Sequence, residues 1–168
     1  MALVTRNIGT PGTILCPNLN SLASSATVGW QSIRIDDTAT NALDYEIKVT
    51  LSTANTTPAN DKAVYVFAAE CYYGSGNTWF HAAGGGTSAP PTGVEGSYTL
   101  ATPHNFRLLG TLNYTTARMV LQDTFHLSNA VGPYLPDGFI IIILNYSGAA
   151  LSATGNSISI KAIKQTIT

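Results

Sequence analysis

The sequence predicts an all-β protein, an antiparallel β-sandwich for which a jelly roll is the preferred topology. Apolar and polar residues alternate without a break from Asp44 to Leu51, the pattern of a strand with one face on a core. Groups of Gly, Pro, Asn and Asp recur between the apolar segments, as chain reversals require. Because no long stretch has apolar residues at helical spacing, we expect helices to be short or absent.

Seven further segments have the composition of strands. In chain order they are Trp30–Ile35, Ala63–Cys71, Phe106–Leu112, Ala117–Gln122, Thr124–Leu127, Phe139–Tyr146 and Ser157–Ile163. Ala63–Cys71 is apolar on both faces, so we expect the partner sheet to cover one face and a loop or neighbouring subunit to cover the other. Its Val, Tyr and Phe residues favour a strand over a short buried helix. The predicted core residues are Tyr45, Ile47, Val49, Val64, Val66, Ile141, Ile143, Ile158 and Ile160.

Two segments lack this pattern. Residues 1–22 contain Gly9, Pro11, Gly12 and Pro17 and little alternation, so we expect an extended N-terminal arm, with residues 23–168 forming a single β-sandwich domain. Ala82–Ser97 is a long loop rich in Gly and Pro. Contact with a partner and plain flexibility both remain open for it.

The charge content limits the partners. Only 10% of the 168 residues are charged and the formal net charge is −1, so no strong field attracts nucleic acid or anionic lipid, and we expect neither. So few charges are typical of a protein that is permanently assembled. Met1–Asn7 has no apolar segment of signal-peptide length, and Phe139–Leu144 is far shorter than the ~20 residues of a membrane-spanning helix. We therefore expect synthesis and retention in a cytoplasm, with Cys16 and Cys71 as separate reduced thiols.

The residues of catalytic and metal sites are present without the required spacing. His81, His104 and His126 are scattered, and Asp36-Asp37 is favoured as part of a turn over a Ca²⁺ or acid/base pair. Two glycine motifs are also incomplete. Gly84–Thr87 lacks the Lys and helix start of a phosphate cradle, and Gly74-Ser75-Gly76 is not a nucleophile elbow. We predict no catalytic, cofactor or metal residue and expect the protein not to be an enzyme.

Four aromatic residues flank the predicted turn at Gly74–Asn77: Tyr72, Tyr73, Trp79 and Phe80. Such rings can form a platform on which sugars stack. Aromatic residues beside a turn more often cap the core or fill a subunit interface. All of these interpretations stay open.

The C-terminal part has the most distinctive arrangement. The apolar strand Phe139–Asn145 continues into Tyr146-Ser147-Gly148-Ala149-Ala150-Leu151, and a small polar turn then leads to the final strand at Ser157–Ile160. This arrangement resembles the C-terminal end of small structural proteins of tailed bacteriophages, and the capsid decoration (cement) proteins are closest in character. The resemblance covers the last fifth or so of the chain.

The resemblance implies a virion structural protein that binds the outer surface of the phage head and stabilises it. Its implied partners are the major capsid protein and further copies of itself, with a trimer favoured and a dimer next. Because charges are few, we expect attachment through apolar burial, backbone hydrogen bonds of the arm and contacts of Ala82–Ser97. Another virion part (head fibre, tail or receptor-binding protein) and a carbohydrate-binding module are the alternatives.

Overall fold

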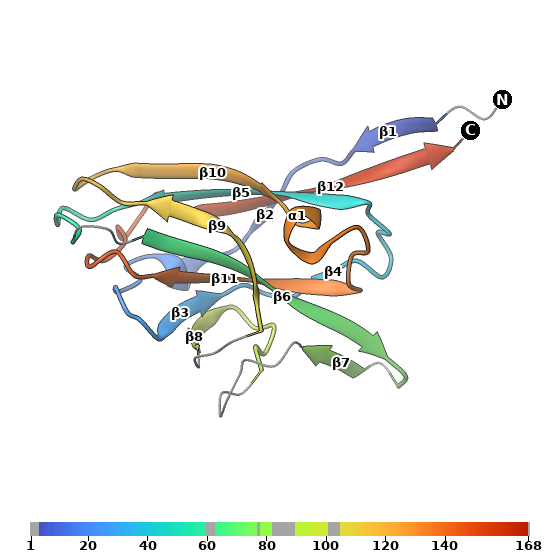
Figure 1. The fold of residues 1–168 in the computed structure, drawn as a ribbon, viewed down its shortest axis with the longest axis horizontal. Coiled ribbons are helices and arrows are strands. Elements are labelled where there is room, and N and C mark those ends of the chain that lie inside the picture. The colour runs from blue at the N-terminus through green and yellow to red at the C-terminus, as the bar shows by residue number, and fades with distance from the viewer. Residues whose placement is uncertain (1–3, 60–62, 77, 82–89, 101–104, 168) are drawn as a thin grey trace.

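The computed structural model describes residues 4–59, 63–76, 78–81, 90–100 and 105–167, which form two antiparallel sheets packed face to face (Figure 1). The five-stranded sheet has the order β1-β12-β5-β10, and β2 also pairs with β12. Its strands are β1 (Val4–Ile8), β2 (Gly12–Ile14), β5 (Asp44–Ser52), β10 (Val120–His126) and β12 (Ser157–Ile167).

The seven-stranded sheet has the order β7-β6-β11-β3-β8, with β4 on β11 and β9 on β6. Its strands are β3 (Val28–Gln31), β4 (Ile35–Asp36), β6 (Ala63–Gly74), β7 (Thr78–His81), β8 (Gly96–Thr99), β9 (Arg107–Asn113) and β11 (Gly138–Asn145). The helices of the described residues are a 3₁₀ turn η1 (Pro17–Leu19) and α1 (Ser128–Val131). The prediction of short helices is therefore confirmed.

The strand order is that of a jelly roll. β1 with β2, and β3 with β4, each act as one interrupted strand, and β7 and β8 belong to an insertion between β6 and β9. The eight strands that remain have the orders 1-8-3-6 in one sheet and 2-7-4-5 in the other. The predicted all-β sandwich with jelly-roll topology is confirmed.

Three of the predicted strands are divided differently in the structure, apart from smaller shifts at the ends of other strands. The predicted strands 117–122 and 124–127 are one strand, β10, because its pairing with β5 continues unbroken through Asp123, which lies opposite Val49. The predicted strand Trp30–Ile35 is interrupted, because Ser32 Oγ accepts the Ile141 N–H at 2.9 Å while the Ser32 N–H donates to Ile141 O at 2.8 Å. At this point between β3 and β4, a side chain thus replaces one backbone group in the hydrogen-bond ladder with β11.

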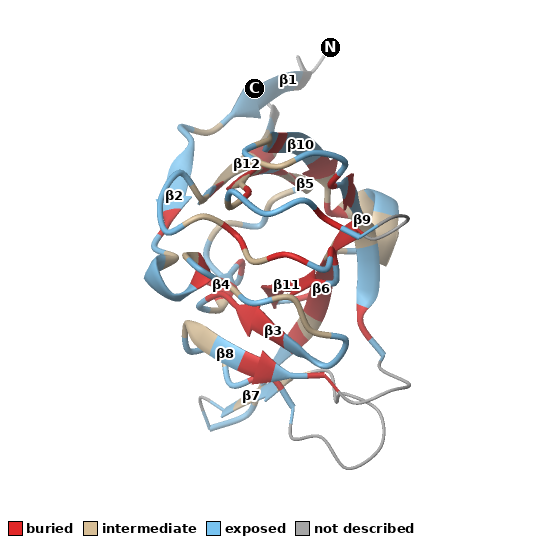
Figure 2. Ribbon diagram, turned by 90° about the vertical axis from the view of Figure 1, so that its left-hand side faces the viewer, coloured by how far each residue is buried: buried red, intermediate tan, exposed pale blue. Residues whose placement is uncertain are grey.

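The main core lies between the two sheets, where Figure 2 shows the buried residues. Eight of the nine predicted core residues belong to it and are buried. The ninth, Ile160, packs against this core and is partly exposed. In β5 the residues Tyr45, Ile47, Val49 and Leu51 are buried and alternate with more exposed neighbours, as the sequence pattern predicts.

A second core covers the outer face of the seven-stranded sheet. Phe67, Ala69 and Cys71 of β6 and alternate residues of β11 pack there under side chains of the insertion, Tyr98, Leu100 and Phe106. Ala63–Cys71 is therefore covered on both faces, as predicted. Since the second cover comes from the same chain, this strand needs no neighbouring subunit to bury it.

The described part of the predicted N-terminal arm, residues 4–22, is paired with its own chain. β1 and β2 add to β12, Ile14 is 3% exposed and Leu19 is fully buried. Their partner lies at the other end of the sequence, and each strand is too short to show alternation. Figure 1 shows β1 and the end of β12 leaving the body of the sandwich side by side.

The predicted loop Ala82–Ser97 falls partly on residues 82–89, which lie outside the described residues. Its second half is held on the sheet and is not a free loop. Thr92 exchanges two hydrogen bonds with Gln31, from Gln31 Nε2 at 2.9 Å and to Gln31 Oε1 at 3.0 Å. Trp30 Nε1 donates to Glu95 Oε1 at 2.6 Å, and β8 begins at Gly96.

Truncation of the central strand should test the position of the core. Ile141→Ala removes a fully buried side chain and should lower the free energy of unfolding by about 2–5 kcal/mol. Ile33→Ala is the matched control, since Ile33 is 47% exposed, and it should change stability by less than about 0.5 kcal/mol. Denaturant unfolding measures both. Equal effects of the two substitutions would show that the strand is placed wrongly.

Candidate functional site

The two histidines that the structure describes lie apart. His81 is in β7 of one sheet and His126 in β10 of the other, while His104 and Gly84–Thr87 lie outside the described residues. His126 Nδ1 is 2.8 Å from Asp44 Oδ2, and Asp44 Oδ1 accepts the Ser128 N–H at 2.9 Å. Within the described ranges, no group of three or more His, Cys, Asp or Glu side chains is placed to hold a metal ion.

Asp36 is the last residue of β4 and Asp37 directly precedes the turn, and both carboxylates bind groups of the turn segment, in agreement with the favoured interpretation. Asp36 Oδ1 accepts the N–H and the hydroxyl of Thr38. Asp37 Oδ1 accepts the Tyr45 hydroxyl at 2.6 Å and the Ala42 N–H at 3.1 Å. Burial, together with the Asp37 carboxylate that its hydroxyl contacts, raises the pKa of Tyr45. Asp37 thus fixes the loop that follows β4.

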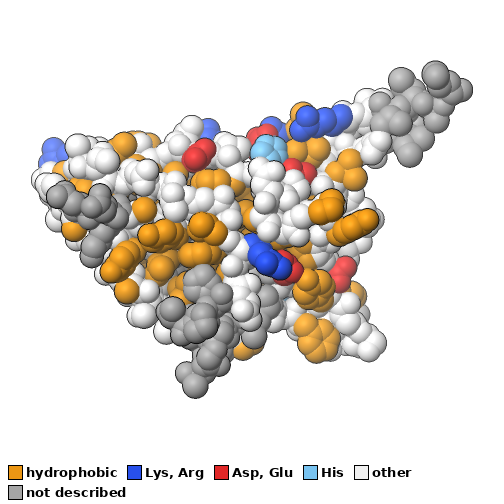
Figure 3. All heavy atoms as spheres, in the orientation of Figure 1, with side chains coloured by type: hydrophobic (Ala, Val, Ile, Leu, Met, Phe, Trp, Pro, Cys, Tyr) orange, Lys and Arg blue, Asp and Glu red, His pale blue; other side chains and the backbone are white. Residues whose placement is uncertain are grey.

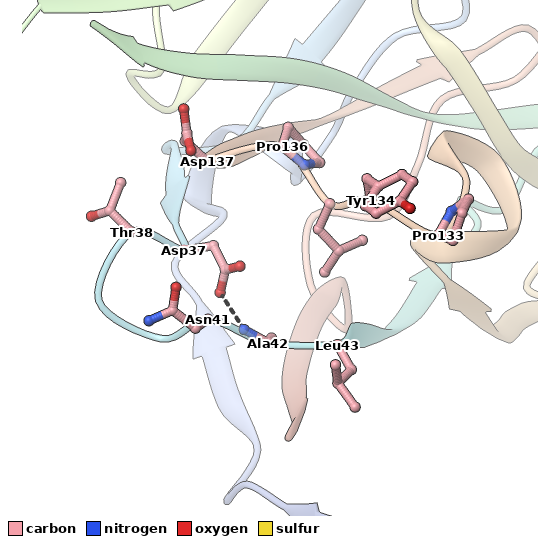
Figure 4. A pocket seen from close by; sticks show the side chains of 10 residues that line it. Asp37, Thr38, Asn41, Ala42, Leu43, Pro133, Tyr134, Pro136 and Asp137 are labelled. Atoms are coloured by element: carbon pink, nitrogen blue, oxygen red, sulfur yellow. Dashed lines mark hydrogen bonds between the residues drawn. The ribbon is translucent and has the colours of Figure 1, made fainter. Parts of the chain in front are cut away.

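This loop forms one wall of a pocket of about 350 Å³, and residues 133–137 form the other wall (Figure 4). Two carboxylates, Asp37 and Asp137, line it. Both are engaged by the fold, because Asp37 binds Tyr45 and Ala42 while Asp137 Oδ2 accepts the Tyr73 N–H at 2.8 Å. Each carboxylate that lines the pocket therefore helps to hold the fold through one of its oxygens.

The cysteines are separate thiols, as predicted. Cys71 is fully buried in the outer core, and this burial raises the pKa of its thiol to about 12. Cys16 is partly buried, and burial raises the pKa of its thiol as well. Both thiols are therefore protonated, and poor nucleophiles, at neutral pH.

Gly74-Ser75-Gly76 lies at the turn from β6 to β7, and Gly76 has a φ of 75°.

The four aromatic residues do not form one platform. β6 and β7 form a hairpin in which Tyr72 pairs with Phe80 and Tyr73 pairs with Trp79, so the two pairs point to opposite faces. The rings of Tyr73 and Trp79 are 5.0 Å apart, and the Arg34 guanidinium lies 4.1 Å from the centroid of the Trp79 ring. This pair is on the face that carries the outer core.

The other pair, Tyr72 and Phe80, is on the face that carries the main core further back along β6. Their exposed fractions are 51% and 60%. The Tyr72 hydroxyl donates to Glu70 Oε2, and Arg107 Nε donates to Glu70 Oε1 at 2.9 Å. Burial alone raises the pKa of the Glu70 carboxyl, but the hydrogen bonds from Tyr72 and Arg107 outweigh it and hold the pKa below its usual value.

These side chains are exposed because β6 is longer than the core beneath it. Val64, Val66 and Ala68 belong to the main core, whereas Glu70, Tyr72 and Gly74 on the same face lie beyond it. Figure 1 shows the end of β6 and β7 extending past the sandwich, and Figure 3 shows hydrophobic side chains standing out from the surface there. Sequence reasoning did not find Glu70 or Arg107, since they lie 37 positions apart and belong to no motif.

The C-terminal motif has a structural role. Asn145 and Ser147 are fully buried, and the Ser147 hydroxyl contacts Asn145 Oδ1 at 2.6 Å. Asn145 Nδ2 donates to Leu22 O at 2.9 Å and to Ala149 O at 2.8 Å. Gly148 has a φ of 87°, which favours glycine. The residues that carry the resemblance therefore join the turn after β11 to the segment before β3.

No family model and no curated protein matches the sequence. Among solved structures, the chain is weakly similar to the infectious bursal disease virus VP2 subviral particle, with 11% identity and a TM-score of 0.16. The match covers 98% of this chain and 40% of that chain, so this chain spans less than half of that protein. A TM-score of 0.16 does not show a shared fold.

In the described part of the chain, no helix is long and apolar enough to cross a membrane.

Removal of the Asn145 amide should be costly. Asn145→Ala removes two hydrogen bonds, to Leu22 O and Ala149 O, and the acceptor of the fully buried Ser147 hydroxyl, and we expect a loss of about 1–3 kcal/mol in the free energy of unfolding. Asn113→Ala, at an exposed position of β9, should change it by less than about 0.5 kcal/mol. If chemical denaturation gives similar values for both, Asn145 does not have this role.

The lowered pKa of Glu70 predicts a pH dependence. At a pH between the folded-state pKa of Glu70 and its usual value of about 4.3, Glu70 binds more protons in the unfolded chain than in the folded one. The stabilisation that the Glu70 carboxylate contributes is therefore complete above about pH 4.3, and it is lost as the pH falls through the folded-state pKa. Glu70→Gln should show a shallower decline of unfolding free energy below about pH 4.3 than the wild type. Identical slopes would contradict the assignment.

Proposed function

We propose that this chain is a structural protein of a tailed-bacteriophage virion, a capsid decoration (cement) protein that binds the outer surface of the head and stabilises it. The observation that carries the proposal is a jelly roll whose polar groups are used to hold its own loops. Asp37, Asn145 and Glu95 all bind backbone or side chains of the same domain. The jelly roll is an architecture of viral capsid and lectin domains, but a fold alone does not assign a function.

The C-terminal arrangement from Phe139 to Ile160 supports the same proposal through its resemblance to small phage structural proteins. The low charge of the chain supports permanent assembly. The proposed partners are the major capsid protein and further copies of this chain, with a trimer favoured by the resemblance and a dimer next. The proposed role requires no catalysis and no cofactor.

The most suitable attachment element is the outer edge of β1. β1 ends the five-stranded sheet, and its residues Thr5 to Ile8 are exposed. An open edge offers backbone N–H and C=O groups with which an extended segment of a partner can pair. Such bonds and apolar burial are screened by salt less than exposed ion pairs are. Attachment through this edge should therefore resist salt.

Purified phage particles test the proposal. Mass spectrometry should find the chain in a copy number close to a fixed ratio of the major capsid protein. Raising salt from about 0.05 to 0.5 M, which shortens the screening length several-fold, should release little of it. A deletion of residues 1–8 should weaken attachment more, and it spares Ile14, which belongs to the main core.

The deletion is informative only if the domain remains folded, so its unfolding transition should match that of the full chain. Absence of the chain from purified particles would contradict the proposed function. Release by salt together with full binding of the deletion variant would show that attachment is electrostatic and does not use the β1 edge.

A further inference from the structure

The exposed face at the end of β6 and β7 combines two kinds of groups. Tyr72 and Phe80 are directly opposite each other and more than half exposed. Beside them, Glu70 fixes both the Tyr72 hydroxyl and the Arg107 guanidinium. More than half of the Arg107 side chain (56%) is exposed, so its terminal N–H groups can reach a ligand. Apolar ring surface and oriented polar groups thus lie within one small area.

We propose that Tyr72, Phe80 and Arg107 form a binding site for a neutral saccharide. The aromatic rings offer the negative faces of their π-systems to the C–H groups of a pyranose ring. Arg107 donates hydrogen bonds to the sugar hydroxyls, and the oxygen of the Tyr72 hydroxyl accepts one. The Glu70 carboxylate balances the Arg107 charge, which favours a neutral ligand over an acidic one.

The geometry selects a smaller group of residues than the sequence pattern did. Tyr73 and Trp79 point to the opposite face, where Trp79 contacts Arg34, so they do not belong to the site. Phe80 lies over Gly74: a Cβ built on Gly74 would be 2.5 Å from Phe80 Cε2. The absence of a side chain at Gly74 therefore allows Phe80 to lie close to the strand and next to Tyr72.

A protein anchor is the competing occupant. Residues that dominate protein interfaces usually insert into well-packed pockets or form them. The pocket of Figure 4 is lined by other residues, and Tyr72 and Phe80 stand on an open hairpin surface. An extended sugar chain can lie across such a surface without a pocket. The inference concerns the isolated protein and does not depend on the proposed attachment to a phage head.

Titration of the isolated protein with soluble oligosaccharides tests the site. Cellohexaose, maltohexaose, laminarihexaose and chitohexaose are added separately to ¹⁵N-labelled protein, up to about 10 mM, a range that detects millimolar Kd values. At least one of them should shift the backbone resonances of residues 70–74, 78–81 and 107. If none of the four does so, the proposal is wrong.

Three variants and one matched control locate the binding. Tyr72→Ala and Phe80→Ala should each raise the Kd by about five-fold or more. Gly74→Ala should also weaken binding, because the added Cβ displaces the Phe80 ring without removing it. Tyr73→Ala changes the adjacent tyrosine on the opposite face and should leave the Kd within about two-fold. All four variants are first shown to be folded by their thermal unfolding.

The remaining outcomes overturn the proposal. Equal loss of affinity in Tyr73→Ala and Tyr72→Ala would show that binding does not use this face. If the wild type binds none of the sugars while Tyr72→Ala and Phe80→Ala fail to attach to phage particles, the face is a protein-docking surface. The copy number of the chain on particles is measured separately, so failure of sugar binding leaves the proposed function intact.

Discussion

The constraint on which the structure depends is that β11 is buried on both faces. Every residue from Gly138 to Asn145 is buried, and alternate side chains belong to the main core and to the outer core. A strand of this kind must be covered on each side, because its side chains are apolar on both faces. The five-stranded sheet supplies one cover. The insertion between β6 and β9 supplies the other through Tyr98, Leu100 and Phe106.

The exposed aromatic pair follows from the same constraint. β6 pairs with β11 along the whole of that strand, and the two covers bury it as far as Cys71. Beyond that point the strand continues to Gly74 with β7 as its partner, and the side chains on the face toward the main core lie outside that core. The side chains there change from Val and Ala to Glu70 and Tyr72, which hydrogen-bond to each other. The hairpin is thus positioned by the core but not covered by it.

The sequence predicts the parts of the fold that repeat over many residues. β5 shows strict alternation, and β11 is a continuous apolar segment, so both were found. β7 and β8 were missed because four residues are too few to show a period, and β1 and β2 because their partner β12 lies about 150 positions away. The sequence contains the information needed to divide the aromatic cluster into two pairs. The predicted strand ended at Cys71, three residues early; extended to Gly74, alternation alone places Tyr72 and Tyr73 on opposite faces. Neither the contact between Arg107 and Glu70 nor the burial of Asn145 leaves a local pattern.

Cryo-electron microscopy of purified particles directly tests the proposal that this jelly roll is a component of a phage head. We expect density on the outer surface of the head into which the two sheets fit, at positions related by the symmetry of the shell. We also expect contact between that density and the major capsid protein. Density for the sandwich in the tail, or a head surface without it on particles that contain the chain, would contradict the proposed role.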